Sequence, residues 1–208
     1  MNEITVLPLG ALATNCYIVP ADEKTAIVID PAATGEVEAV LASKDMRAGA
    51  IIITHGHFDH FAGAARLRNY YGAPIYAPEL DSEMLASEDK SWAWFMGGIE
   101  FTPIVPDYAF ENGERFTVCG LEFSVMAAPG HTAGSCLLFC EKYGAIFAGD
   151  VIFKNGCGRT DGFSGSDRQM LQTLREIAKI PGNYAVYPGH GETTTLAVEK
   201  ARIDVYDY

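Results

Sequence analysis

Three histidines and one aspartate lie within six residues of the chain, at His55, His57, Asp59 and His60. They directly follow the apolar run at residues 50–53, which predicts a buried strand that ends where the polar cluster begins. Gly56 permits a tight turn inside the cluster, and strand ends form natural crevices in folds that mix strands and helices. Neutral imidazole and carboxylate are ligands that zinc, iron and manganese accept. The cluster therefore predicts a metal site.

Every other histidine of the chain also stands just after a strand-like segment, as do Asp30 and Asp150. The five histidines together with Asp59 and Asp150 make seven donors. Seven donors are too many for one tetrahedral ion, but they suit two ions that share a carboxylate. Asp30 has two interpretations: it caps a turn, or it holds a ligating histidine from behind.

The elements that must position these residues follow from periodicity. Strands are predicted over short apolar or β-branched runs: 4–7, 15–19, 25–29, 50–53, 73–77, 115–119, 121–127, 135–140, 145–148 and 185–187. Helices are predicted where apolar residues recur at helical spacing: 36–43, 61–71, 79–87, 167–180 and 192–202. The first three strands form a meander, and strands and helices then alternate, which implies a layered α/β fold.

Composition limits the possible partners. The 208 residues carry a net charge of −12, which disfavours nucleic acid. No apolar run of about 18 residues predicts a membrane span, and no secretory signal begins the chain, so a cytoplasmic location is expected. Without a linker or low-complexity segment, one domain over residues 1–208 is expected. The oligomeric state is not indicated.

Two segments leave their roles open. The five cysteines are an odd number without a CxxC pair, so no disulfide framework is expected, and Cys136 and Cys140 are expected to pack as small hydrophobic residues. Residues 91–99 contain both tryptophans. This aromatic segment has three interpretations: a lid over a substrate, a contact between subunits, or ordinary core.

The motifs appear in a fixed order. They are His-x-His-x-Asp-His at 55–60, Pro-Gly-His-Thr at 129–132, Gly-Asp at 149–150 and Gly-His at 189–190. This series resembles the metallo-β-lactamase fold superfamily. Within it the chain looks most like the glyoxalase II (hydroxyacylglutathione hydrolase) branch and its short bacterial relatives, because residues 149–153 and 156–159 are similar to the corresponding glyoxalase II run. The resemblance implies an αββα sandwich with metals at one edge.

The resemblance also implies roles for single residues. It gives three ligands to a first metal, three to a second, and one bridging carboxylate: His55, His57 and His131; Asp59, His60 and His190; and Asp150. Asp30 matches the aspartate that stands behind the ligands in the family. Arg159 matches a basic residue that holds the thiol-bearing half of the substrate, and its other interpretation is a solvated loop arginine.

The implied activity is hydrolysis of a small-molecule thioester, such as a hydroxyacylglutathione, by a hydroxide that bridges two divalent metals. Zinc is the expected metal, and the same donors accept iron or manganese. Asp59 and Asp150 are the expected catalytic residues, and a thiolate leaving group needs little general acid. Full-length glyoxalase II enzymes carry a basic C-terminal extension, whereas 18 residues (191–208) follow His190 here, so recognition of glutathione stays open.

Other functions compete with this hypothesis. Iron-dependent persulfide dioxygenases and lactone or phosphoester hydrolases share the fold, and a structural metal protein without catalysis is a third class. Structural zinc sites are rich in cysteine, whereas the ligands here are histidine and aspartate. The most familiar β-lactamase subgroup has cysteine where Asp150 stands, and flavodiiron proteins have glutamate where His57 stands, which disfavours both.

Overall fold

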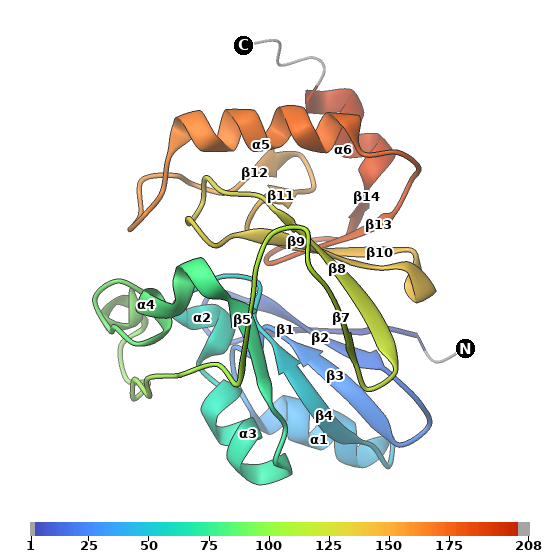
Figure 1. Ribbon diagram of the computed structural model, residues 1–208. Coiled ribbons are helices and arrows are strands. Elements are labelled where there is room, and N and C mark those ends of the chain that lie inside the picture. The colour runs from blue at the N-terminus through green and yellow to red at the C-terminus, as the bar shows by residue number, and fades with distance from the viewer. Residues whose placement is uncertain (1–2, 204–208) are drawn as a thin grey trace.

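A computed structural model describes residues 3–203, and it has two six-stranded sheets packed face to face with helices outside each (Figure 1). Helices α1 (Gly35–Ser43) and α3 (Ala64–Tyr71) cover the first sheet. Helices α5 (Asp167–Lys179) and α6 (Leu196–Ile203) cover the second. The predicted mixed α/β fold, an αββα sandwich, is confirmed.

The first sheet has its strands in chain order. They are β1 (Thr5–Leu9), β2 (Thr14–Pro20), β3 (Thr25–Ile29), β4 (Arg47–Ile52), β5 (Ile75–Pro78) and β6 (Tyr108–Phe110). Strands β1 to β3 form the predicted antiparallel meander, and β3 to β6 run parallel. The parallel part arises because helices connect β3 to β4 and β4 to β5.

The second sheet is mainly antiparallel and has the order β14-β13-β10-β9-β8-β7. Its strands are β7 (Arg115–Val118), β8 (Leu121–Ala127), β9 (Cys136–Cys140), β10 (Ala145–Gly149), β13 (Ala185–Pro188) and β14 (Thr194–Thr195). A small hairpin of β11 (Ile152–Phe153) and β12 (Gly156–Cys157) follows β10. The predicted hairpin of β7 and β8 is present.

Alternation along β4 explains how one strand serves two cores. Ala50 and Ile52 belong to the core between the sheets, whereas Ile51 and Ile53 pack under the helices of the first sheet. Successive side chains of a strand point to opposite faces, so a strand that is buried on both faces is apolar throughout. The end of this buried run places the polar cluster at the edge of the sandwich.

One predicted helix is interrupted. The helix expected over 61–71 is split into α2 (Phe58–Phe61) and α3, and α2 therefore contains Asp59 and His60. The break lies at Gly63, whose N–H donates to the carbonyl of Pro31 at 2.7 Å, and a Cβ there would come within 2.8 Å of the Ala33 carbonyl oxygen. The polar cluster thus lies at the N-terminal end of the first of these two helices, with His57 directly before α2.

Other boundaries also differ from the prediction. The segment expected as a helix over 79–87 forms a 3-10 turn, η1 (Glu79–Asp81), and the short α4 (Ser82–Leu85). The last helix begins at Leu196, because the residues before it pair with β13 as β14. Strands β6, β11, β12 and β14 were not predicted, since each has only two or three residues.

Among the described helices, none has the length and apolar character needed to cross a membrane. The five cysteines are free, and Cys136 and Cys140 are buried as predicted.

Candidate metal centre

All seven predicted donors meet at one edge of the sandwich, where loops from both sheets converge. His55 and His57 lie after β4, Asp59 and His60 in α2, His131 after β8, Asp150 after β10, and His190 after β13. Their donor atoms form three overlapping groups, each with all atoms within 4.8 Å of one another: His55, His57 and His131; His55, His60 and Asp150; Asp59, His60 and His190. The structure therefore brings together residues as far apart in sequence as His55 and His190.

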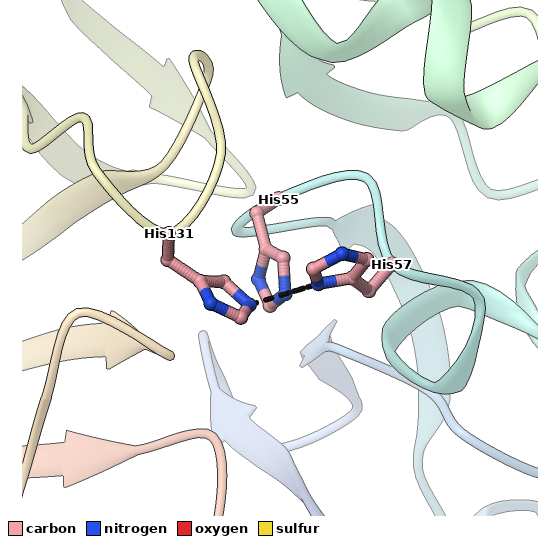
Figure 2. A group of neighbouring side chains, drawn as sticks. All are labelled: His55, His57 and His131. Carbon is pink, nitrogen blue, oxygen red and sulfur yellow. Dashed lines mark hydrogen bonds between the residues drawn. The ribbon is translucent and has the colours of Figure 1, made fainter. Parts of the chain in front are cut away.

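The first group consists of His55, His57 and His131, whose rings point toward one another (Figure 2). His57 Nδ1 lies 2.8 Å from His131 Nε2 and 3.2 Å from His55 Nε2. Burial and the neighbouring imidazoles lower the pKa of His55, and the same causes lower that of His57 to about 3. These rings are therefore held neutral, which is the form that binds metals.

The second group joins Asp59, His60 and His190, and Asp150 connects it to the first. His60 Nε2 lies 3.4 Å from Asp59 Oδ2 and 3.4 Å from Asp150 Oδ1. Asp150 Oδ2 lies 3.5 Å from His190 Nε2 and 3.5 Å from His131 Nε2. One carboxylate thus faces both groups, the arrangement that a bridging ligand requires.

The histidines and aspartates around the second group shift one another's pKa values. Burial alone would raise the pKa of Asp59, but His60 and a hydrogen bond from His190 lower it to about 2. Burial opposes ionisation of Asp150 in the same way, and His60 and His190 again lower its pKa. Despite burial, the two carboxylates raise the pKa of His60 and bring that of His190 to about 9. Without metal, protons on these two rings therefore balance the carboxylates.

Asp30 stands behind this centre and holds His60. Its Oδ2 accepts from His60 Nδ1 at 2.9 Å, and its two oxygens also accept from the Thr54 N–H and hydroxyl, at 2.8 and 2.7 Å. The Thr54 hydroxyl in turn lies 3.1 Å from His55 Nδ1. Of the two interpretations of Asp30, the contact behind a donor histidine is the one that the structure supports.

Three further contacts hold donors of the centre, and two of them come from residues that the sequence did not single out. His131 Nδ1 donates to the Arg159 carbonyl at 2.7 Å, and His190 Nδ1 to the Leu12 carbonyl at 3.1 Å. Thr14, the first residue of β2, donates its hydroxyl to Asp59 Oδ2 at 2.7 Å. Only the fold places Leu12 and Thr14 here, because β2 reaches the His190 loop through a bridge between Thr14 and His190.

Asp81 is a buried carboxylate that ties two donor-bearing loops together. Its oxygens accept from the N–H of Gly56 at 2.8 Å, the N–H of Gly134 at 2.7 Å and the hydroxyl of Thr132 at 2.7 Å. Burial raises its pKa against these hydrogen bonds. Gly56 separates His55 from His57, and Thr132 follows His131. Asp81 therefore fixes the spacing of the loops that carry the first group.

The donor set fits divalent cations. Among the described residues, the buried side-chain atoms without a hydrogen-bond partner are His57 Nε2, His60 Nε2 and Asp150 Oδ1. Buried polar atoms are rarely left without a partner, and two of these three face the space between the aspartates and histidines. Imidazole nitrogens and carboxylate oxygens turned toward one point, with their far sides held by hydrogen bonds, are typical of metal centres.

Arg159 and Trp92 lie at the rim of the centre, where the Arg159 carbonyl contacts His131 and the Trp92 ring contacts His57. The Arg159 guanidinium pairs with Asp161, with Nε 2.6 Å from Oδ1, and lies 4.9 Å over the Trp92 ring. Trp92 is half-buried, but Trp94 and Phe95 are 61% and 65% exposed. The interpretation of residues 91–99 as ordinary core is therefore wrong for Trp94 and Phe95.

Comparisons with known proteins agree with this geometry. Residues 9–190 match the family model described as the metallo-beta-lactamase superfamily. The hydroxyacylglutathione hydrolase GloC of Haemophilus influenzae is 30% identical over 95% of this chain and 94% of that protein. The crystal structure of the BLEG-1 B3 metallo-beta-lactamase covers 99% of this chain and 100% of its own, with a TM-score of 0.91 and 29% identity.

A second solved structure, TTHA1623 in a di-iron-bound form, has a TM-score of 0.84 and 30% identity, and covers 96% of this chain and 98% of its own. The family match spans nearly all of the elements that bring the seven donors together. The chain therefore belongs to the metallo-beta-lactamase superfamily, whose members bind divalent metal ions.

Proposed function

We propose that the protein is a dinuclear metal-dependent thioesterase that hydrolyses hydroxyacylglutathiones or closely similar thioesters. The observation that carries this proposal is the position of Asp150, whose carboxylate faces the donor atoms of both histidine groups at 3.4–3.5 Å. Such a carboxylate suits a centre of two ions that share a ligand. The likeness to GloC supports a hydroxyacylglutathione as the substrate class.

In this proposal the residues have distinct roles. His55, His57 and His131 would hold one ion, Asp59, His60 and His190 would hold the other, and Asp150 would be shared between them. When bound, the pair of divalent ions polarises the substrate carbonyl and lowers the pKa of water to about 7, so that hydroxide is available near neutral pH. Asp59, kept ionised and held by Thr14, orients the attacking oxygen through its own carboxylate.

A thiol leaving group suits this site because the site has no separate group to protonate it. All five histidines of the chain belong to the cluster, so none is left as a separate general acid. A thiolate is a stable leaving group that needs no proton in the step that expels it, whereas an amine or alkoxide does. This favours a thioester over an amide or an ordinary ester. In the same proposal, the exposed guanidinium of Arg159 attracts an anionic part of the substrate.

Zinc is the proposed metal, with iron as the second candidate. The two groups offer nitrogen and oxygen donors without sulfur, which zinc, iron and manganese all accept. The di-iron-bound form of TTHA1623 is the observation that favours iron. An iron centre would also open the way to the alternative activity, oxidation of a persulfide.

The test loads the metal-free protein separately with zinc, iron and manganese and quantifies the metal in the assayed sample. Turnover of S-lactoylglutathione at an ordinary enzymatic rate with two ions per chain is expected. A lactone, a phosphodiester and a β-lactam serve as parallel substrates, the last because BLEG-1 is a β-lactamase. Oxygen uptake with glutathione persulfide tests the dioxygenase. Two bound ions without thioester turnover would refute the substrate class but leave the metal centre standing.

A further inference from the structure

Four of the five histidines are oriented by a hydrogen bond on the ring nitrogen that faces away from the centre. The partners of these Nδ1 atoms are the Thr54 hydroxyl for His55, Asp30 for His60, the Arg159 carbonyl for His131 and the Leu12 carbonyl for His190. Such contacts fix the tautomer and the ring plane of a metal ligand. They leave Nε2 of each ring turned toward the centre.

His57 is the exception among the five. Its Nδ1 faces His55 and His131, at 3.2 and 2.8 Å, so the nitrogen that must be held from outside is Nε2 (Figure 2). Within residues 3–203, Nε2 of His57 is buried and has no hydrogen-bond partner. A ring with one free nitrogen needs another contact if its plane is to be defined.

That contact is an aromatic stack with Trp92. The two ring centroids lie 4.6 Å apart and the ring planes differ by 17°. The backbone of Trp92 adopts a left-handed conformation with φ of 61°, which is rare for a residue with a side chain. The N–H of Phe58, which directly follows His57, donates to the Ser91 carbonyl at 2.9 Å, so the two segments are also joined through their backbones.

The indole is supported by the loop that follows β12. The Arg159 guanidinium lies 4.9 Å from the centroid of the Trp92 ring. Gly162 packs so closely that a Cβ on this residue would come within 2.8 Å of Trp92 Cζ2. Arg159 also accepts from His131 through its carbonyl, so one loop supports two of the three donors of the first group.

We propose that Trp92 is the positioning residue of His57: its indole face, supported by Arg159, sets the imidazole plane in place of the hydrogen bond that orients the other four rings. Nδ1 of His57 is thereby directed into the first metal group. The inference rests on the proposed role of His57 as a metal ligand, but it concerns metal binding alone and needs no knowledge of the substrate.

The tryptophan content of the chain makes a direct test possible. Trp92 and Trp94 are the two tryptophans, and Trp94 is exposed. Trp94→Phe therefore leaves Trp92 as the single reporter, and Trp92→Phe leaves Trp94. Cobalt(II), which quenches nearby indole fluorescence, is titrated into each metal-free protein. We expect strong quenching of the Trp92 fluorescence in Trp94→Phe, and this quenching should reach its maximum when one equivalent of cobalt has filled the first group. Quenching of Trp94 in Trp92→Phe should be clearly weaker.

A second experiment measures the metal affinity of variants that lack Trp92, by competition with a chelator. Trp92→Leu removes the aromatic face but keeps an apolar side chain, whereas Trp92→Phe keeps a smaller aromatic face. Loss of a residue that supports a ligand typically lowers metal affinity by about 10- to 100-fold. Competition with a chelator should show that loss for one equivalent in Trp92→Leu, and most of the affinity should return in Trp92→Phe. Trp94→Leu is the matched control and should bind both equivalents as the parent does.

Five results would overturn the proposal. Equal quenching of Trp92 and Trp94, or unchanged affinity in Trp92→Leu, would show that the stack does not position His57. Equal loss of both equivalents, or an equal loss in Trp92→Phe and Trp92→Leu, would point to general destabilisation, which thermal unfolding of the metal-free variants would register. A parent protein that binds no metal would overturn both this inference and the proposed function.

Discussion

Asp30 lies directly behind His60, with Oδ2 2.9 Å from the ring Nδ1, and this contact turns Nε2 toward Asp59 and Asp150. The same aspartate accepts from the N–H and the hydroxyl of Thr54. A single buried carboxylate thus fixes the tautomer of one donor and, through Thr54, the orientation of His55. Its Oδ1 accepts from the backbone N–H of Thr54, whereas Oδ2 accepts from the Thr54 hydroxyl and from His60 Nδ1.

Asp30→Asn should lower metal affinity while it keeps the volume of the side chain. The amide oxygen must accept from the Thr54 N–H, so the amide NH₂ faces His60 Nδ1 and favours the tautomer protonated on Nε2, which cannot bind a metal through that atom. We expect a loss of about 10- to 100-fold for the equivalent held by Asp59, His60 and His190. Isothermal titration of the metal-free variant measures it. Asp45→Asn, at an exposed aspartate, is the control and should bind as the parent does.

Asp150→Ala should abolish turnover and leave the fold intact. This carboxylate touches both groups, so its removal affects both ions, and loss of about 4 kcal/mol of transition-state stabilisation corresponds to roughly a thousandfold in rate. Steady-state kinetics on protein with its metal quantified is the measurement, and circular dichroism checks the fold. Substantial turnover by a fully loaded Asp150→Ala protein would contradict the two-metal mechanism.

Asp81 gives a prediction about the stability of the protein. Its carboxylate accepts from Gly56, Thr132 and Gly134, and an asparagine would set an amide N–H against one of these donors. A buried donor left without an acceptor costs about 1–3 kcal/mol. Asp81→Asn should therefore lower the free energy of unfolding of the metal-free protein by about that amount, measured by urea denaturation. Asp161→Asn, at an exposed aspartate, should change it little.

Much of the centre could be predicted from sequence because its donors stand in short motifs at strand ends. Among the residues that hold the donors, Asp30 follows from the sequence as one of two interpretations. Leu12, Thr14 and Asp81 do not, since they reach the centre only through the packing of the two sheets. The split between α2 and α3 was missed because helical periodicity continues through residues 61–71, whereas the close approach of Gly63 to Pro31 depends on the fold. Likewise, an aromatic segment alone does not show that Trp92 stacks on His57.

Metal affinity should rise with pH across the neutral range. In the metal-free protein the carboxylates raise the pKa of His60 and bring that of His190 to about 9, so both rings carry protons at pH 7. A metal must displace these protons, and each proton released adds a tenfold gain in affinity per pH unit below the pKa of its ring. Chelator competition between pH 6 and 9 should show affinity for the Asp59, His60 and His190 group increasing until His190 has lost its proton. An affinity independent of pH would contradict these pKa shifts.

Arg159 provides a test of substrate recognition, which is made in metal-loaded protein because the same guanidinium also supports Trp92. Its guanidinium is exposed at the rim and partly neutralised by Asp161, so an anionic substrate must compete with that carboxylate. In fully metal-loaded protein, Arg159→Gln should raise KM for S-lactoylglutathione by about tenfold with a smaller change in kcat, because a rim contact contributes mainly to ground-state binding. Asp161→Asn removes the competing carboxylate and should lower KM or leave it unchanged. If both variants raise KM equally, the pair acts as one structural unit of the loop, and the anion must be bound elsewhere.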